Sequence, residues 1–258
     1  MHHAYLDKFA YQDSPVHRLD SRVKFIALVT FTVAVLSLPR TSISILTCYA
    51  IGPFAVLAIG GIPLRFVFKH ILLVSPFVAV LALSCPLYDK TMVPAYFGPC
   101  TFEISKGWLR CFAILGKFIV TMLALISLVS TTRFSNLLVG LQKLGTPELL
   151  VIQLGFLYRY IFVLIDKVQH MLRARASRRL RNLGFRQEFR IASSMVGSIL
   201  VRSIDTAENI NIAMQGRGFD GRWRSLHRPR ISSNDWVFAA VVCCFLLTLE
   251  FFIKPVLT

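Results

Sequence analysis

The apolar positions of the chain fall into five long runs, of which the first four follow one another closely and the fifth lies near the C-terminus. The runs extend over Val23–Leu38, Ser42–Ile59, Phe66–Pro86, Trp108–Ser130 and Trp236–Ile253. Helical runs of about this length match the hydrophobic thickness of a bilayer, and helices satisfy their own backbone hydrogen bonds in lipid. The pattern therefore predicts an all-α membrane protein with about five transmembrane helices.

A different pattern begins after the fourth run. Ser135 is a suitable N-cap for a short helix, and Gly145 can supply the left-handed residue that ends it. Residues 146–148 are Thr-Pro-Glu. They suit the start of a second helix, because threonine caps, proline fits the first turn and glutamate favours the positive end of the helix dipole. We expect this second helix to continue to about Leu180.

A third helix of this region is expected over Glu188–Gln215, where residues of one face recur at steps of three and four. The stripe consists of Val196, Ile199, Leu200, Ile204, Ala207, Ile210, Asn211 and Met214. The opposite face is polar, so this helix should not lie wholly in lipid, and most of the stripe should pack within the protein. The predicted divisions are 1–133 with four spans, 134–232 with the long helices, and 233–258 with the last span.

Composition and charge agree with a membrane class and give it an orientation. The chain is 55% hydrophobic, has a mean hydropathy of +0.62 and carries a formal net charge of +16. Its most basic stretch lies between Arg133 and Arg230, and short basic segments beside transmembrane helices stay in the cytoplasm. We therefore expect the N-terminus and residues 134–232 inside the cell, and the 87–107 loop and the C-terminus outside.

Few ionisable side chains fall inside the apolar stretches. Lys117 lies in the fourth run, where the cost of a charge makes it a candidate functional residue, although a lysine can also extend its ammonium toward the headgroups. Arg159 lies in an apolar part of the second long helix, which we expect to leave the membrane surface for the cytoplasm. Cys85 and Cys100 share a loop that could face an oxidising side, and the sequence leaves their pairing open.

Both long helices are expected to end in a similar motif. The endings are Ala174-Arg175-Ala-Ser-Arg178-Arg179 and Ala213-Met-Gln-Gly216-Arg217-Gly218-Phe219. The helix dipole favours an arginine at a C-terminus, and the planar guanidinium can bind a carboxylate through two parallel hydrogen bonds. Glycines beside the second arginine would allow close backbone approach. One such arginine alone is often merely solvated or bound to lipid phosphate, whereas the repetition predicts two similar docking points.

The two motifs resemble the paired Ala-Arg-Gly signatures of the transmembrane T component of energy-coupling-factor (ECF) transporters. In the first copy Arg179 replaces the family's glycine, so the equivalent arginine can be Arg178 or Arg175. The N-terminal string is similar to the cobalt and nickel branch of this family, the CbiQ type. It runs from Leu6 to Lys24 and includes His17, Arg18, Asp20 and Arg22. Further stretches that resemble the family are Ser130-Thr-Thr132, Leu144-Gly-Thr-Pro147 and Tyr158-Arg159-Tyr160.

The resemblance implies an energy-coupling scaffold of an ATP-driven cobalt or nickel importer in the cytoplasmic membrane of a bacterium or archaeon. Its partners would be two copies of an ABC-type ATPase subunit and a membrane-embedded, metal-binding substrate component, with or without a small accessory membrane subunit. The candidate ATPase-coupling residues are Ala174, Arg175, Arg178, Arg179, Ala213, Gly216, Arg217 and Gly218. The structural or interface candidates are His17, Arg18, Asp20, Arg22 and Arg159.

No catalytic chemistry, cofactor or metal site is expected in this chain itself. It contains no Gly-x-x-x-x-Gly-Lys-Ser/Thr phosphate loop, so ATP hydrolysis would fall to the partner subunits. His2 and His3 lie at a terminus expected in the cytoplasm, across the membrane from an incoming ion. The resemblance places ion binding in the partner, and His17 should instead organise the start of the first span.

Other functions remain open at this point. A vitamin-importing T component would have the same arginines, and a permease that works alone should show paired ionisable groups or inverted repeats within its spans. The basic cluster between Arg173 and Arg190 could also bind anionic lipid or nucleic acid. We expect the lipid bilayer, and not nucleic acid, as a partner.

Overall fold

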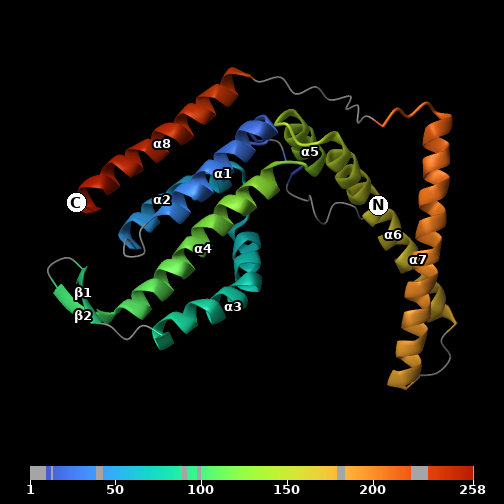
Figure 1. Ribbon diagram of the computed structural model, residues 1–258, viewed down its shortest axis with the longest axis horizontal. Coiled ribbons are helices and arrows are strands. Elements are labelled where there is room, and N and C mark those ends of the chain that lie inside the picture. Colours follow the sequence, from blue (N-terminus) through green and yellow to red (C-terminus); the bar gives the residue numbers. More distant parts are fainter. Residues whose placement is uncertain are drawn as a thin grey trace. The chain divides into compact units, whose positions relative to one another are not determined.

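The computed structural model shows eight helices and one β-hairpin among the residues that it describes (Figure 1). Those residues are 10–12, 14–38, 43–88, 92–97, 100–178, 184–221 and 232–257. The helices are α1 (Ser21–Ser37), α2 (Ile43–Ile59), α3 (Leu64–Tyr88), α4 (Lys106–Thr131), α5 (Phe134–Lys143), α6 (Glu148–Ser177), α7 (Phe185–Gly216) and α8 (Ser233–Leu257). The strands β1 (Met92–Phe97) and β2 (Cys100–Ser105) pair antiparallel. The expected all-α class describes the chain except for this hairpin, which lies in the 87–107 loop.

The chain divides into two compact units, which are described separately. Unit 1 comprises Met1–Gly140 and Arg228–Thr258, and unit 2 comprises Leu141–His227. Unit 1 includes α1 to α4 and α8, and each of these helices coincides with one of the five apolar runs to within a few residues. Unit 2 includes α6 and α7.

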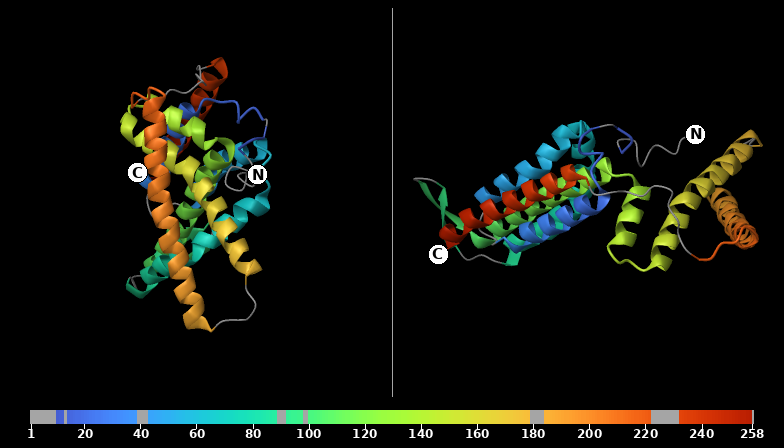
Figure 2. Two further views of the ribbon diagram at one scale, coloured as in Figure 1. Left: turned by 90° about the vertical axis from the view of Figure 1, so that its right-hand side faces the viewer. Right: turned by 90° about the horizontal axis from the view of Figure 1, so that it is seen from above.

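Helix α4 lies at the centre of unit 1. It contacts α1, α2 and α3, while α8 packs against α1 and α2 (Figure 2). The main core cluster consists of Phe31, Val35, Leu38, Leu46, Tyr49, Val120, Ala124 and Leu246. Gly116 on α4 leaves room for the side chain of Leu46 on α2, because a Cβ there would collide with Cδ2 of Leu46. Small residues at such crossings are typical of packed membrane helices.

Three helices are long and apolar enough to cross a membrane, judged by length and composition. They are Leu64–Leu87, Gly107–Thr131 and Glu148–Ser177. The described parts of α2 and α8 include the shorter apolar helices Leu46–Ile59 and Ser233–Leu249. On α3, Leu73 and Phe77 are 78% and 73% exposed, as expected for side chains that face lipid or another protein. The protein is therefore a multi-pass membrane protein, and the set of long apolar helices includes α6, which the sequence analysis assigned to the cytoplasm.

In unit 2, α6 and α7 form an antiparallel pair. Arg175, near the end of α6, forms an ion pair with Glu188 in the first turn of α7. Toward the middle of both helices, Lys167 Nζ donates a hydrogen bond of 2.9 Å to Thr206 Oγ1. The second helix ends at Ser177, short of Leu180, and the third begins at Phe185, one turn before its expected start.

The apolar stripe of α7 packs less than expected. Val196, Leu200 and Ile204 are 66%, 61% and 54% exposed, and no residue of α7 is buried. The prediction that most of the stripe packs within the protein is wrong for these residues. Three residues of the stripe do line a cavity of about 220 Å³ between α7 and α6, namely Ala207, Ile210 and Met214.

The predicted helix starts in this region differ in detail from the observed ones. Helix α5 begins at Phe134, so Ser135 lies in its first turn and not at its N-cap. Pro147 occupies the N-cap of α6 without a side-chain hydrogen bond, in place of the expected threonine cap. The predicted end of α5 is correct, because Gly145 has a φ of +95°, which favours glycine.

Candidate functional site

Arg178 and Arg217 occupy the same position at the ends of the two long helices. Arg178 is the C-cap of α6 with φ −96° and ψ −2°, and Arg217 is the C-cap of α7 with φ −95° and ψ 7°. Both residues are exposed. Arg175, the other candidate in the first motif, is engaged in the ion pair with Glu188. By position, Arg178 is therefore the counterpart of Arg217.

The end of α7 is a Schellman motif built on Gly218. The Phe219 N–H donates to the Met214 carbonyl over 3.0 Å, and the Gly218 N–H donates to the Gln215 carbonyl over 2.9 Å. Gly218 has a φ of +75°, in the region where a residue with a Cβ is strained. This turn ends the helix directly after Arg217 and leaves its guanidinium exposed.

Small residues accompany both arginines. Ala174 and Ala213 each precede the C-cap arginine by four positions, so each lies on the same helix face as its arginine. Both alanines are exposed, and no atom lies within 4 Å of the place where a Cβ on Gly216 would be. The surface around each helix end is thus open to a partner. Arg179 lies outside the described residues.

The two C-cap arginines lie at opposite ends of the α6–α7 pair. Arg178 lies where α6 ends and α7 is about to begin, whereas Arg217 follows Met214, which lines the cavity together with Phe156 from the first half of α6. Helix α7 has 32 residues. A helix of that length spans about 48 Å at 1.5 Å per residue. Unit 2 therefore separates its two arginines by a distance comparable to the diameter of a protein domain.

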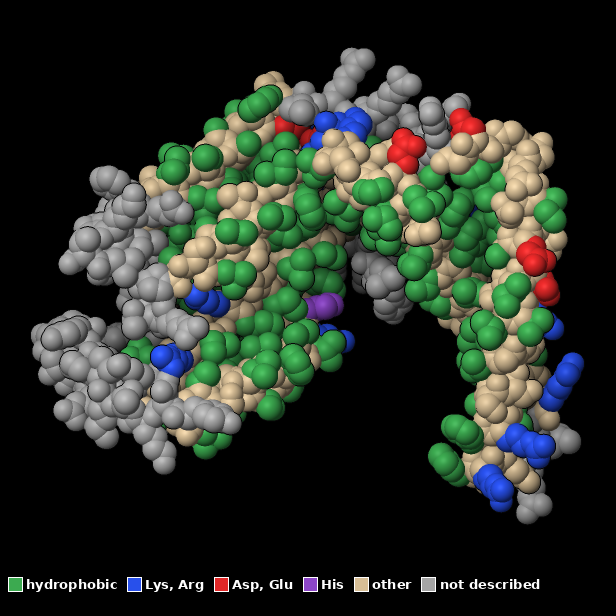
Figure 3. All heavy atoms as spheres, viewed as in Figure 1, with side chains coloured by type: hydrophobic (Ala, Val, Ile, Leu, Met, Phe, Trp, Pro, Cys, Tyr) green, Lys and Arg blue, Asp and Glu red, His purple; other side chains and the backbone are tan. Residues whose placement is uncertain are grey.

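The ends of the pair also differ in charge. Basic side chains gather where α6 ends and α7 begins, and the acidic side chains of α7 other than Glu188 lie farther along the helix (Figure 3). The basic residues at this end are Arg173, Arg175, Arg178, Arg186 and Arg190. Phe185 and Phe189 lie beside them, 88% and 69% exposed. An acidic surface with an apolar rim would complement this end of the pair.

A second group of motif residues lies at the start of α1 and is buried. Asp20 caps α1, since its Oδ1 accepts a hydrogen bond of 3.0 Å from the Arg22 N–H. The Asp20 N–H donates over 2.8 Å to Oδ1 of Asp235, a residue in the first turn of α8 that is only 2% exposed. Asp235 Oδ2 accepts from the Ser232 N–H over 2.7 Å. The N-termini of α1 and α8 thus converge on two carboxylates, which their helix dipoles favour.

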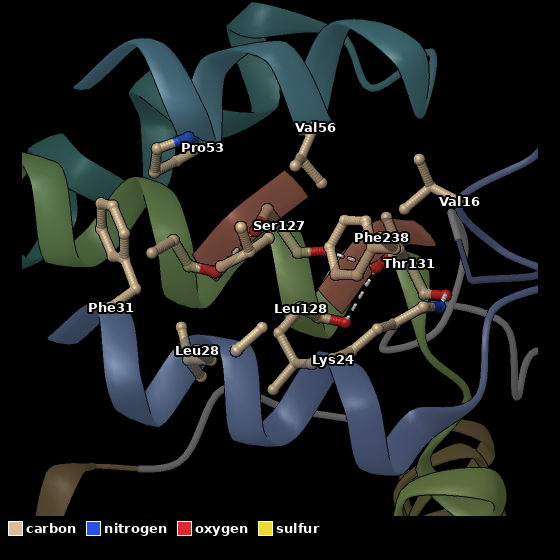
Figure 4. A pocket seen from close by; sticks show the side chains of 13 residues that line it. Val16, Lys24, Leu28, Phe31, Pro53, Val56, Ser127, Leu128, Thr131 and Phe238 are labelled. Atoms are coloured by element: carbon tan, nitrogen blue, oxygen red, sulfur yellow. Dashed lines mark hydrogen bonds between the residues drawn. The ribbon is translucent and has the colours of Figure 1, made fainter. Parts of the chain in front are cut away.

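Lys24 connects this group to the end of α4. Its Nζ donates to the Thr131 carbonyl over 3.0 Å and to Thr132 Oγ1 over 3.3 Å, and the residue is 5% exposed. Figure 4 shows Lys24 and Thr131 among the side chains that line a pocket. The stem of Lys24 lines an apolar cavity of about 80 Å³ together with Leu28 and Phe238. Sequence reasoning did not single out Lys24 and Asp235. Asp235 could have been noticed in the sequence, because it is an acidic residue directly before the last apolar run.

The remaining candidates of the N-terminal string lie around Asp20. His17 Nδ1 and Ser14 Oγ are 2.7 Å apart and hydrogen-bonded, and Arg22 Nε lies 3.8 Å from Asp20 Oδ1. Arg18 is exposed. Arg159 is also exposed and belongs to unit 2, where its guanidinium carbon lies 5.9 Å from the centre of the Tyr160 ring.

Lys117 caps a neighbouring helix. Its Nζ donates to the carbonyls of Leu36 over 3.0 Å and Leu38 over 2.7 Å, at the C-terminal end of α1. A cation is favourable at this end of a helix, where carbonyls lack intrahelical partners. The contact assigns Lys117 a structural role.

The last candidates to consider are residues that could hold a metal ion and the pair Cys85 and Cys100. In the described part of the chain, no group of three or more His, Cys, Asp and Glu residues could hold a metal ion. His2 and His3 lie outside that part. Cys85 is a free thiol among the described residues, and the side chain of Cys100, the partner that the sequence left open, lies outside them.

Comparison with known proteins identifies transport proteins of one kind. The CbiQ family, described as cobalt transport protein, matches residues 12–228. The energy-coupling factor transporter transmembrane protein EcfT of Heliobacterium modesticaldum is 25% identical over 250 residues, which cover 92% of each chain. The cobalt transport protein CbiQ of Rhodobacter capsulatus is 27% identical over 204 residues, 78% of this chain and 80% of the relative. The nickel permease LarQ of Lactiplantibacillus plantarum is 31% identical over 94 residues, 36% and 33% of the two chains.

Proposed function

The chain belongs to the CbiQ family of cobalt transport proteins, and on that premise we propose that it is the energy-coupling transmembrane scaffold of an ATP-driven importer of cobalt or nickel. In this proposal it hydrolyses no ATP and binds no ion itself. It links two copies of an ABC-type ATPase subunit to a membrane-embedded substrate-binding component. The relatives of the chain include an ECF transmembrane protein, a cobalt transport protein and a nickel permease, and these relatives support the proposal.

One observation supports the coupling role most directly: two equivalent C-cap arginines lie at opposite ends of one antiparallel helix pair. Two identical ATPase subunits offer two identical docking grooves, and each needs a similar motif at a separate place. The α6–α7 pair supplies both. Arg178 and Arg217 would bind carboxylates in the grooves, because their guanidinium groups are exposed and the helix dipoles favour cations there.

The neighbouring residues have distinct parts in this proposal. Ala174 and Ala213 have small side chains, so a groove on the ATPase can fit closely against the helix face beside each arginine. Gly216 and Gly218 do the same for the backbone of the second motif. Arg175 fixes the end of α6 to α7 through Glu188. Arg179 would extend the basic surface of the first motif.

The proposed orientation places unit 2 in the cytoplasm. The end of α4 and the starts of α1 and α8 are bonded to one another and so lie at the same end of unit 1. The basic residues that flank these ends favour the cytoplasmic side. Helix α6 is apolar enough to touch lipid, but it pairs with α7. No residue of α7 is buried, and charged side chains occur along its length. The C-terminus would lie outside.

ATP binding would draw the two ATPase subunits together and move the two ends of the α6–α7 pair. The pair would pass this motion to unit 1 and to the substrate-binding component, which would release its ion to the cytoplasm. A T component of a vitamin importer is the alternative, and it would use the same arginines. The neighbouring genes distinguish the two, because a metal importer should be encoded beside a metal-binding membrane protein.

Removal of the two arginines tests the docking role. Arg217→Ala should leave the chain inserted in the membrane but weaken ATPase capture in a pull-down, at a cost of about 2–5 kcal/mol for one side of a desolvated charge pair. Arg178→Ala should have the same effect, and either single variant should retain at most one ATPase copy by native mass spectrometry. Arg186→Ala is the matched control, because it removes an exposed arginine of the same basic surface that is not a C-cap.

The proposal fails if Arg178→Ala and Arg217→Ala both capture the ATPase and take up radioactive cobalt or nickel as the unaltered chain does. Equal losses in the Arg186→Ala control would indicate general charge attraction and would also contradict it. Cysteine labelling tests the orientation separately. Reaction of residues in α7 with an impermeant reagent in intact cells would place unit 2 outside and end the proposal.

A further inference from the structure

The chain passes between the two units twice. It leaves unit 1 after Gly140 and returns at Arg228. On the outgoing side the last elements of unit 1 are the end of α4 and the first part of α5. On the returning side the first described elements are Ser232 and the start of α8. These two connections join α6 and α7 covalently to the helices of unit 1.

The outgoing connection is bonded to the first turn of α1 at three places. Lys24 Nζ donates to Thr131 O and Thr132 Oγ1 at the end of α4. Ser21 Oγ donates over 2.7 Å to the carbonyl of Asn136 in α5. Gly140 packs against the same serine, since a Cβ at Gly140 would lie 2.6 Å from Ser21 Oγ.

The returning connection is bonded to the same short segment. The Asp20 N–H donates to Asp235 Oδ1, and Asp235 Oδ2 accepts from the Ser232 N–H. Asp20, Ser21 and Lys24 are 6%, 5% and 5% exposed. Water competes poorly with hydrogen bonds at such sites, and an unmade bond there is costly. Asp20 and Asp235 also supply the opposite charges next to Lys24.

We infer that the segment Asp20–Lys24 is the anchor that fastens both connections of unit 2 to unit 1, and that Ser21, Lys24 and Asp235 are positioning residues for energy coupling. The inference rests on the proposed function. Because one buried turn is bonded to both connections, a displacement of the α6–α7 pair moves α1, α4 and α8 together. Without these bonds each connection would yield separately, and the ATPase motion would be lost between the units.

The test uses the complete transporter, in which this chain is assembled with its ATPase and substrate-binding partners in lipid. Lys24→Met removes the ammonium and keeps most of the apolar stem. It should leave ATPase capture and ATP hydrolysis intact and lower cobalt or nickel uptake per ATP by roughly five-fold or more, the lower range of coupling between sites. Lys24→Arg, which keeps a cationic donor, should recover most of the uptake. Ser21→Ala removes only the bond to Asn136 and should give a smaller loss of the same kind.

Lys117→Met is the matched control. It also removes a lysine that donates to two groups at a helix end, but this end of α1 is far along the helix from the anchor. It should lower thermal stability without changing uptake per ATP. If Lys24→Met does not insert, Ser21→Ala decides the question with the same readout.

Two results would overturn the inference. One is unchanged uptake per ATP in Lys24→Met and Ser21→Ala, and the other is an equal loss in Lys117→Met. Either result would leave the proposed function standing as long as Arg217→Ala still weakens ATPase capture. Failure of the arginine variants to affect capture would contradict the proposed function instead.

Discussion

Units 1 and 2 use their polar side chains in opposite ways. In unit 1, Asp20, Lys24 and Asp235 are almost fully buried, and their bonds join the ends of three helices. In unit 2, the C-cap arginines are exposed, and the described residues of α7 include none that is buried. Helix α6 is still apolar enough to be ranked with α3 and α4 as a possible span.

The difference separates two functions of charge. Buried groups with satisfied bonds fix one arrangement, because breaking any bond leaves a desolvated group unpaired. Exposed groups at helix ends contribute little to folding and remain available to another protein. Substitutions of buried groups in unit 1 should therefore cost more stability than substitutions of exposed groups in unit 2.

The largest effect is expected for Asp235. Asp235→Ala leaves the buried N–H of Asp20 without an acceptor, at about 1–3 kcal/mol, and removes the bond to the exposed Ser232, at about 0.5–1.5 kcal/mol. The free energy of unfolding should fall by roughly 1.5–4.5 kcal/mol. Asp205→Ala removes an exposed carboxylate from α7 and should change stability by at most about 0.5 kcal/mol. Denaturation in mixed SDS micelles, followed by circular dichroism, measures both. Similar losses in the two variants would erase the distinction between the units.

The helices of unit 1 were predictable from the sequence, whereas the anchor was not. Apolar runs report which residues avoid water, so α1 to α4 and α8 coincide with the predicted runs. Asp20 and Asp235 are separated by 215 positions. No local pattern encodes a contact between them, and only the packing of α1 against α8 brings them together.

In unit 2 the position of the arginines was predictable, but the choice between Arg175 and Arg178 was not. A helix C-terminus followed by glycine has a sequence signature, which located Arg217 correctly at the end of α7. The first motif lacks that glycine. The choice depends on where α6 ends and on the contact of Arg175 with Glu188, and both are properties of the folded pair.

An intermediate effect is expected for the two lysines that donate to another helix. Lys117→Met should cost about 1–3 kcal/mol, because two carbonyls at the end of α1 lose their donor in an apolar setting. Lys167→Met removes one bond, to the hydroxyl of Thr206, which can turn toward water. It should cost about 0.5–1.5 kcal/mol. The thermal midpoints of the two variants in the same detergent provide the measurement. A greater loss for Lys167→Met would mean that α6 and α7 form the more tightly bonded region.

The smallest effect is expected for the ion pair of Arg175 and Glu188. Their side chains are 25% and 28% exposed, and water screens part of the attraction. Pairs of this kind contribute about 0–1 kcal/mol. A double-mutant cycle with Arg175→Gln and Glu188→Gln in the isolated chain should give a coupling energy within that range, and salt should reduce it further. A coupling energy near 3 kcal/mol would show that this end of unit 2 resembles the anchor of unit 1. In that case unit 2 would also contain tightly bonded polar groups, and the contrast between the two units would hold only for the residues of unit 2 that lie beyond this ion pair.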